Sequence, residues 1–434
     1  YNRWKIFSSF AKSIFSKFAK IMLCILIPMT GILHASETIK IGVLHSLSGT
    51  LAISETTLKD TMEMLIEDQN KQGGVLGKKL EAVVVDPASN WPLFAEKARE
   101  LIQKDQVSVI FGCWTSVSRK SVLPVIEELN GLLFYPVQYE GEESSKNVFY
   151  TGAAPNQQAI PAVDYLLSEE GGLVKRFALL GTDYVYPRTT NKILEAYLKS
   201  KGIPDEDIMI SYTPFGHSDW QTIVADVKKF GASGKKTAVV STINGDANVP
   251  FYKELGNQGV SAEDIPVIAF SVGEEELAGL DTTPLVGHLA AWNYFMSIES
   301  EENEAFIKKW KAFIKDPKRV TNDPMEAHYI GFKMWVQAVN QAGTFNVDAV
   351  RQAMYGQEVK NLTGGMAVMN TNHHLSKPVV IGEIQEDGQF ETVWSTDNVV
   401  KGDAWTDYLT ESSKLTADWT YPWVCGGCEN PTFN

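Results

Sequence analysis

The sequence predicts an α/β fold of two similar lobes, each a parallel β-sheet flanked by helices in a Rossmann-like sandwich. Short buried strands alternate with amphipathic helices along most of the chain. This alternation runs to about residue 135 and starts again at about residue 176. The 434 residues, 44% of them hydrophobic and 21% charged, suffice for two or three ordinary soluble domains.

The first lobe begins with a run of β-branched and apolar residues at 39–44, which predicts a buried strand. Leu58 and Met62 belong to an apolar series at helical spacing, which predicts a helix over 56–72. By the same two patterns, further strands are expected at 80–85, 107–111 and 132–135, and further helices at 92–104 and 118–128. Right-handed crossovers are expected between parallel strands joined in this way.

The second lobe repeats the order. Strands are predicted at 176–180, 208–212, 237–240 and 267–270, and helices at 188–201, 219–230 and 249–258. The last third is less regular and predicts helices at 302–315 and 324–342 and a hairpin of 379–384 with 390–394. Because this part must return to both lobes, we expect a hinge. The expected division is 1–35 as a signal peptide, 36–155 with about 290–368 as the first lobe, 156–289 with about 369–424 as the second, and 425–434 as a tail.

Charge excludes some partners and indicates export. With 53 acidic against 39 basic residues the net charge is −14, which disfavours nucleic acid and anionic lipid. Residues 1–35 contain five basic residues, no acidic one and the apolar run 21–27, and end at the small residue Ala35. This pattern predicts a secretory signal peptide cleaved after Ala35, and hence a periplasmic protein. The apolar run is short for a membrane span, and an uncleaved anchor is the alternative.

No catalytic motif is present in the sequence. The glycine-rich segment 70–77 follows a helix and precedes a strand, the reverse of a phosphate-binding loop, and predicts a helix end and a turn. His373 and His374 stand among polar residues, which favours a solvated loop over a metal site. Ser116 and Ser118 lie outside any G-x-S-x-G pattern. We therefore expect a protein that is not an enzyme and has no cofactor or metal.

The cysteines predict structure rather than chemistry. In an exported protein, Cys425 and Cys428 favour a local disulfide in the tail, with free thiols or half of a zinc site as alternatives. Cys113 is expected to be a small buried apolar residue.

Several segments between residues 38 and 424 resemble the type I periplasmic binding proteins. These segments are 41–50, 70–77, 111–116, 135–141, 152–157, 181–187 and 241–248. Within that family they resemble the Leu/Ile/Val-binding proteins, the amide-sensing regulators and, most closely, the urea-binding subunits of urea ABC transporters. The resemblance implies two lobes, joined by three crossovers, that close over a small ligand. It also implies the membrane permease of an ABC transporter as partner.

Ligands of open α/β sheets bind beyond the carboxyl ends of the strands. The loops expected there are 46–50, 113–116 and 136–139 in the first lobe, and 182–186, 244–248 and 273–275 in the second. Ser116 stands at the start of a helix, so its hydroxyl and a helix N–H could bind a ligand carbonyl. The resemblance to the amide sensors implies ligand contacts at Trp114, Ser116, Tyr135, Tyr184 and Tyr186.

The sequence departs from the amide sensors at Val137, Gln138 and Asp246, and urea suits these departures. Urea is planar and neutral, with one carbonyl and four N–H donors, so a buried site for it needs several acceptors. Gln138 and Asp246 can supply acceptors, and the aromatic residues can supply flat walls. We expect Ser116 and Asp246, one from each lobe, to be bridged by the ligand, which would favour the closed protein.

Other ligands and roles remain as alternatives. These are short aliphatic amides, branched amino acids, and an amide-type ligand sensor. An amino acid would need partners for its ammonium and carboxylate, and the cleft loops contain no clearly assignable arginine. The amide sensors work in the cytoplasm, which disagrees with a signal peptide. The sequence therefore predicts the solute-binding subunit of a urea importer.

Overall fold

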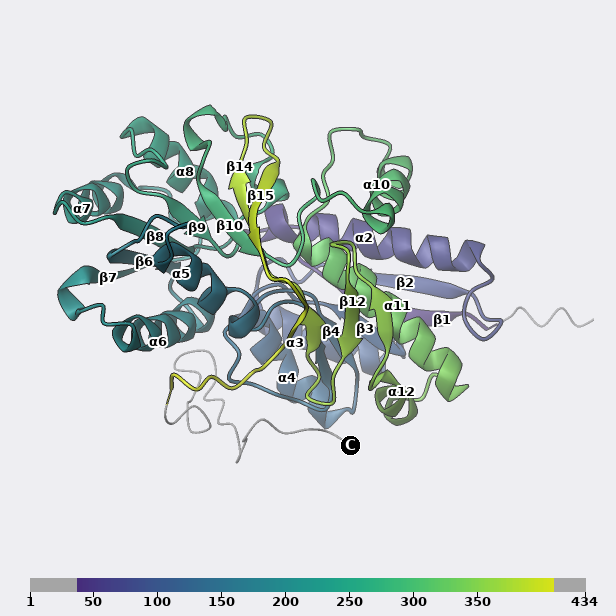
Figure 1. The fold of residues 1–434 in the computed structure, drawn as a ribbon. Coiled ribbons are helices and arrows are strands. Elements are labelled where there is room, and N and C mark those ends of the chain that lie inside the picture. The colour runs from purple at the N-terminus through teal and green to yellow at the C-terminus, as the bar shows by residue number, and fades with distance from the viewer. Residues whose placement is uncertain (1–36, 410–434) are drawn as a thin grey trace, which may run out of the picture. The chain divides into compact units, whose positions relative to one another are not determined.

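The computed structural model describes residues 37–409 (Figure 1). Two large β-sheets lie in this part of the chain, and each forms the centre of one lobe. The predicted signal peptide 1–35 and the pair Cys425 and Cys428 lie outside the described residues. Within 37–409, no helix is both long and apolar enough to cross a bilayer.

The first lobe is built on a five-stranded sheet, with all its strands parallel, in the order β2-β1-β3-β4-β5. In chain order its strands are β1 (Ile39–Leu44), β2 (Leu80–Val85), β3 (Val109–Gly112), β4 (Leu133–Tyr135) and β5 (Val148–Tyr150). Its helices are α2 (Ala52–Lys71), α3 (Trp91–Gln103), α4 (Ser116–Glu128), α10 (Glu301–Ile314), α11 (Asp323–Ala342) and α12 (Val347–Met354).

Helices cover both faces of this sheet. On one face Gly42 of β1 lies against Leu101 of α3, beside its strand neighbour Ile110. The next residue, Phe111, points to the other face, because side chains alternate along a strand, and packs against Phe332 of α11. Helices α3 and α4 pack together, as do α2 and α11.

The second lobe is built on a seven-stranded sheet in the order β15-β14-β10-β9-β8-β6-β7. In chain order its strands are β6 (Arg176–Thr182), β7 (Ile208–Thr213), β8 (Thr237–Thr242), β9 (Val267–Ala269), β10 (Leu289–Trp292), β14 (Val380–Ile384) and β15 (Phe390–Ser395). Only β14 and β15 run antiparallel to their neighbours. Its helices are α5 (Ala159–Leu167), α6 (Val185–Ser200), α7 (Gln221–Gly231), α8 (Asn248–Asn257) and α9 (Glu274–Leu277).

Alternation along β6 divides the second lobe's core into two layers. Ala178 and Leu180 pack in one apolar cluster with residues of α7 and α8. Phe177 and Leu179 pack in another with residues of α5 and α6. The predicted two-lobe α/β fold with mostly parallel sheets is confirmed, and each predicted strand and helix overlaps an observed one.

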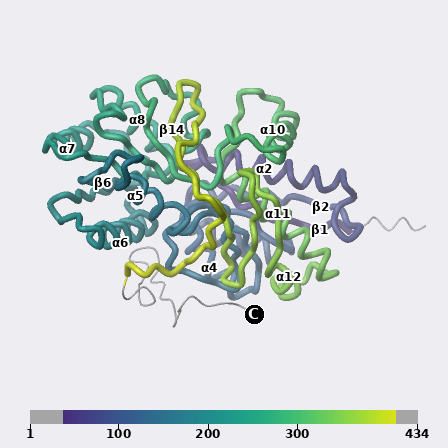
Figure 2. Tube along the Cα trace, in the orientation of Figure 1, coloured from purple at the N-terminus to yellow at the C-terminus, as the bar shows by residue number. Residues whose placement is uncertain are grey.

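A small antiparallel sheet completes the first lobe. It contains β11 (Glu358–Lys360), β12 (Met366–Met369), β13 (Leu375–Lys377) and β16 (Val400–Lys401) in that order. Met369 and Leu375 belong to the first lobe's core. The chain therefore passes between the lobes after β5, after β10 and after β13, and once more where β15 leads to β16 (Figure 2). The three expected crossovers are thus joined by a fourth, because β16 returns to pair with β13.

Two buried amides tie these passages together. The side chain of Asn293, after β10, donates to the carbonyls of Gln157 (3.1 Å) and Pro378 (2.9 Å). Gln157, after β5, donates from its Nε2 to the carbonyls of Leu375 (2.8 Å) and Val400 (2.7 Å). Each passage between the lobes is thus hydrogen-bonded to another.

The expectation of a solvated loop at His373 and His374 is wrong, because both side chains are buried. The His373 ring stacks on Phe149 with 4.2 Å between ring centroids, and the His374 ring stacks on Tyr150 at 4.5 Å. Burial lowers the pKa of His373 to about 3 and that of His374 to about 4, so both rings are neutral. They cover strand β5 at the edge of the first sheet.

Candidate functional site: the cleft between the lobes

The carboxyl ends of the two parallel sheets face a common boundary between the lobes. Loops after β1, β3 and β4 reach it from the first lobe, and loops after β6, β8 and β9 from the second. Three hydrogen bonds cross it: Gln138 Nε2 donates to Ser271 Oγ (2.8 Å), the Asp246 N–H to the Thr50 carbonyl (3.0 Å) and Ser54 Oγ to Glu276 Oε1 (2.9 Å). The two lobes are therefore closed on each other.

The turn after β3 places Trp114 and Ser116 at this boundary. Cys113 takes a left-handed backbone conformation (φ 67°) and redirects the chain at the end of the strand. The Thr115 hydroxyl oxygen accepts the N–H of Ser118 (3.1 Å) and so caps α4, which begins at Ser116. The Tyr135 hydroxyl, at the end of β4, donates to the Trp114 carbonyl (2.7 Å), so three predicted site residues lie together.

The hydroxyl of Ser116 is already engaged within the protein. Ser116 Oγ donates to Glu140 Oε2 at 2.5 Å and accepts from Arg119 Nη1 at 3.3 Å. Its single proton therefore does not point to the cleft, in contrast to the expected donation to a ligand carbonyl. The backbone N–H of Ser116 remains as a donor, because the first N–H groups of a helix have no carbonyl partner within it.

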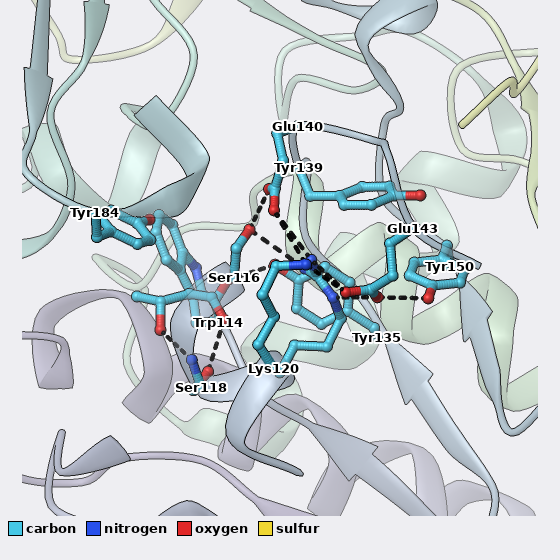
Figure 3. Close-up of polar contacts among 12 residues, drawn as sticks. Trp114, Ser116, Ser118, Lys120, Tyr135, Tyr139, Glu140, Glu143, Tyr150 and Tyr184 are labelled. Atoms are coloured by element: carbon cyan, nitrogen blue, oxygen red, sulfur yellow. Dashed lines mark hydrogen bonds and ion pairs between the residues drawn. The ribbon is translucent and has the colours of Figure 1, made fainter. Parts of the chain in front are cut away.

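Behind Ser116 lies a buried set of four charges that balance one another (Figure 3). Arg119 Nε donates to Glu143 Oε2 (2.7 Å), and Arg119 Nη2 donates to Glu140 Oε1 (3.3 Å). Lys120 Nζ lies 2.9 Å from Glu143 Oε1. Burial alone would raise the pKa of Glu143, but Arg119 and Lys120 lower it to about 2. The set carries two positive and two negative groups and has no net charge.

The second lobe contributes two tyrosines from the start of α6. Tyr184 and Tyr186 are buried and pack with Val117 of α4, across the boundary. The Asn244 side chain donates to the Tyr184 hydroxyl. Burial raises the pKa of both tyrosines, and the negative charge of Glu140 raises it further. Both phenols are therefore neutral.

Three buried polar atoms at the boundary have no hydrogen-bond partner in the structure. They are Gln138 Oε1, Asn244 Oδ1 and the Tyr186 hydroxyl. Two are acceptors, and the third can donate or accept. Because each unmade hydrogen bond costs about 1–3 kcal/mol, these atoms together indicate a place for a polar ligand.

Asp246 differs from this group in its exposure. Its side chain is exposed, and its contact with the first lobe is made by the backbone N–H to Thr50. The other six predicted site residues, Trp114, Ser116, Tyr135, Gln138, Tyr184 and Tyr186, are buried at the boundary.

Sequence reasoning missed Arg119, Glu140, Asn244 and Ser271. Arg119 follows Ser116 by three residues, a spacing that puts both on the same face of a helix. Glu140 lies within the motif 135–141, two residues after Gln138. Helical spacing was thus the available signal for Arg119, and proximity to Gln138 was the signal for Glu140.

The sequence pattern of the periplasmic binding protein domain matches residues 39–411. The chain belongs to this family. This periplasmic binding protein is 25% identical, over 389 residues, to "Leu/Ile/Val-binding protein homolog 7" of Brucella melitensis, with 84% of this chain and 94% of that relative covered.

Solved structures share the fold of this binding protein. An amino acid ABC transporter substrate-binding protein of Pseudomonas fluorescens has a TM-score of 0.70 and 19% identity, and covers 86% of this chain and 97% of its own. A solute-binding protein of Rhodopseudomonas palustris, in complex with 4-hydroxybenzoate, has a TM-score of 0.73 and 19% identity, and covers 83% and 98%. These likenesses concern the fold.

In the described part of this binding protein, the boundary offers hydrogen-bonding groups rather than a reactive thiol or a metal site. Cys113 is buried, as expected, and burial with the nearby charge of Glu55 raises its thiol pKa. Within residues 37–409, no three His, Cys, Asp or Glu side chains are placed to hold a metal ion. Both lobes bring polar groups to the boundary, and Gln138 Oε1 of the first lobe and Asn244 Oδ1 of the second could each accept a hydrogen bond.

Proposed function

We propose that the protein is the periplasmic solute-binding subunit of an ABC importer, that it captures urea between its lobes, and that it delivers urea to the membrane permease. Membership of the periplasmic binding protein family supports the solute-binding role. The names of the similar proteins support a transporter. The basic and apolar pattern of residues 1–35 supports export.

The observation that carries the choice of ligand is the set of partnerless buried atoms. Gln138 Oε1 comes from the first lobe and Asn244 Oδ1 from the second, and both can accept an N–H. Urea has two amino groups on opposite sides of one carbonyl, so a single molecule can donate to both lobes. Its carbonyl can accept from the Tyr186 hydroxyl or from the Ser116 N–H.

The charges of the site favour a neutral ligand. Arg119, Lys120, Glu140 and Glu143 already form ion pairs with one another. An amino acid brings a carboxylate and an ammonium, and each would need a partner of its own when buried. A short aliphatic amide is neutral but has one amino group, so it would leave one acceptor unpaired.

We assign Asp246 to closure rather than to the ligand. Its exposed carboxylate competes with water for any partner, whereas its N–H bonds Thr50 only when the lobes meet. A ligand that draws the lobes together stabilises this contact as well, because it binds the closed form better than the open one.

Isothermal titration of the protein, freed of bound ligand by unfolding in guanidinium chloride and refolding, tests the proposal. We expect urea to bind more tightly than acetamide, and leucine and benzoate not to bind. Asn244→Ala should weaken urea binding by about ten- to a hundredfold, because a buried acceptor and a partner of Tyr184 are lost. The control Asn257→Ala, at the end of α8, should keep wild-type affinity. Binding of leucine or benzoate without binding of urea would overturn the proposal.

A further inference from the structure

Glu140 is a buried carboxylate that contacts Ser116 at the boundary between the lobes and Arg119 behind it. Its side chain is 1% exposed. One oxygen, Oε2, accepts the proton of Ser116, and the other, Oε1, accepts from Arg119 (Figure 3). The same carboxylate is therefore bound to a neutral hydroxyl and to a guanidinium.

Glu140 accepts the proton of Ser116, which stands at the boundary between the lobes. After burial, the charge of Glu140 is among the causes that raise the pKa of Tyr184 and of Tyr186. Its neighbour Glu143 is bonded to Arg119 (2.7 Å), Lys120 (2.9 Å) and the Tyr150 hydroxyl (2.5 Å). Of the two buried glutamates, Glu140 is the one bonded to Ser116 at the boundary.

Two chemical consequences follow for a ligand. Since Ser116 gives its proton to Glu140, its oxygen can only accept hydrogen bonds from the cleft. Since Arg119 is bonded to both Glu140 and Glu143, it has no unpaired positive charge to offer a carboxylate. The side chains beside the Ser116 hydroxyl therefore present acceptors, one of them the Glu140 carboxylate that is paired with Arg119.

We infer that Glu140 determines which ligands the site accepts: it selects neutral ligands rich in N–H groups and rejects carboxylates. This inference rests on the proposed function and deepens it. A carboxylate placed at the Ser116 hydroxyl meets the like charge of Glu140 and a hydroxyl without a free proton. An N–H ligand in the same place meets acceptors, one of them charged.

Glu140→Gln tests this selection by isothermal titration with urea and with acetate at about pH 7. We expect urea to bind about ten- to a hundredfold more weakly, because a charged acceptor becomes neutral. We also expect acetate, which does not bind the wild type, to bind measurably, because Arg119 and Lys120 then outnumber Glu143. The control Glu128→Gln, at the exposed end of α4, should keep the wild-type behaviour toward both compounds.

A second variant, Glu140→Asp, separates charge from geometry and serves if the glutamine variant does not fold. It keeps the negative charge but shortens the side chain, so we expect weaker urea binding and still no acetate binding. Thermal melting of each variant shows whether it is folded.

The outcomes distinguish this inference from the proposed function. A wild type that does not bind urea overturns both. A wild type that binds urea, with Glu140→Gln that keeps this affinity or fails to bind acetate, overturns the inference alone. If only Glu140→Asp folds, wild-type urea affinity in that variant overturns it.

Discussion

The Ser54 hydroxyl of the first lobe donates a 2.9 Å hydrogen bond to the Glu276 carboxylate of the second. The other oxygen of Glu276 accepts the N–H of Gly273 at 2.9 Å, which fixes the carboxylate within α9. Neither residue belongs to the group of partnerless atoms that we assign to the ligand. The contact therefore stabilises the closed protein whichever ligand is bound.

Ser54→Ala removes this contact and should shift the protein toward its open form. Because a hydrogen bond to a charged group contributes about 1.5–3 kcal/mol, we expect ligand affinity to fall by about tenfold or more. Titration measures the affinity, and small-angle scattering measures the compaction on ligand addition. Ser121→Ala is the control, since that hydroxyl bonds the Val117 carbonyl within α4. Equal affinities in the two variants would show that the Ser54 bond does not contribute to closure.

Stability should fall as the pH rises from about 7 to about 9, above the range in which the buried histidines oppose this trend. Burial raises the pKa of Glu274 to about 8 and that of Glu275 to about 7, from an ordinary 4.5. The folded protein thus keeps protons that the unfolded chain has released, so this stabilisation is complete below about pH 4.5 and is lost as the pH approaches 8. The melting temperature measured from pH 7 to pH 9 should show this decline.

Glu274→Gln should flatten that dependence, because an amide does not titrate. A part of the pH dependence should remain, because other titratable groups lie near these carboxylates. They are Glu276, Asp60 and Asp323, with Arg319 as a nearby cation. Glu195→Gln serves as control, since Glu195 pairs with Lys199 on the surface of α6. A wild-type slope in Glu274→Gln would contradict the assignment.

Arg119→Leu should destabilise the protein strongly. It leaves Glu140 and Glu143 buried with Lys120 as the remaining cation of the set, and breaking a buried ion pair in this way costs about 3–5 kcal/mol. Unfolding should be followed in guanidinium chloride, because urea is the proposed ligand. In contrast, Arg99→Leu removes an exposed pair with Glu128 and should change the free energy of unfolding by about 0.5 kcal/mol or less.

Cys113 should resist alkylation in the native protein at about pH 8. Its side chain is buried, and burial raises the thiol pKa, so the reactive thiolate is scarce. Iodoacetamide treatment followed by peptide mass spectrometry should find Cys113 unmodified in the native state and modified after unfolding in guanidinium chloride. Rapid native modification would mean that the turn after β3 opens readily.

Much of the fold could be predicted because it depends on local periodicity. Apolar runs such as 237–240 and helical spacing such as that of Leu58 and Met62 persist in the structure as β8 and α2. The burial of His373 and His374 could not be predicted in this way, because it results from stacking on β5, more than two hundred residues earlier in the chain.

The candidate site could be predicted in part. Loops after the strands were located, since parallel strands end at one edge of their sheet. The direction of each side chain could not be read from the sequence, which is why Asp246 was expected at the ligand and is exposed instead. From the sequence, the Ser116 hydroxyl is expected to donate to the ligand. Its actual acceptor, Glu140, lies on a different loop and meets Ser116 only in the folded chain.

The amides of Asn293 and Gln157 restrict how the lobes can move. Passages that were independent could twist separately and allow the lobes to approach each other from many directions. Here the Asn293 side chain hydrogen-bonds two carbonyls, those of Gln157 and Pro378. The Gln157 side chain hydrogen-bonds two more, those of Leu375 and Val400, so the passages are linked to one another. We therefore expect the lobes to open and close about one hinge, with Gln138 meeting Ser271 whenever they close. Two amide side chains outside the boundary would then determine how the facing loops of the two lobes meet.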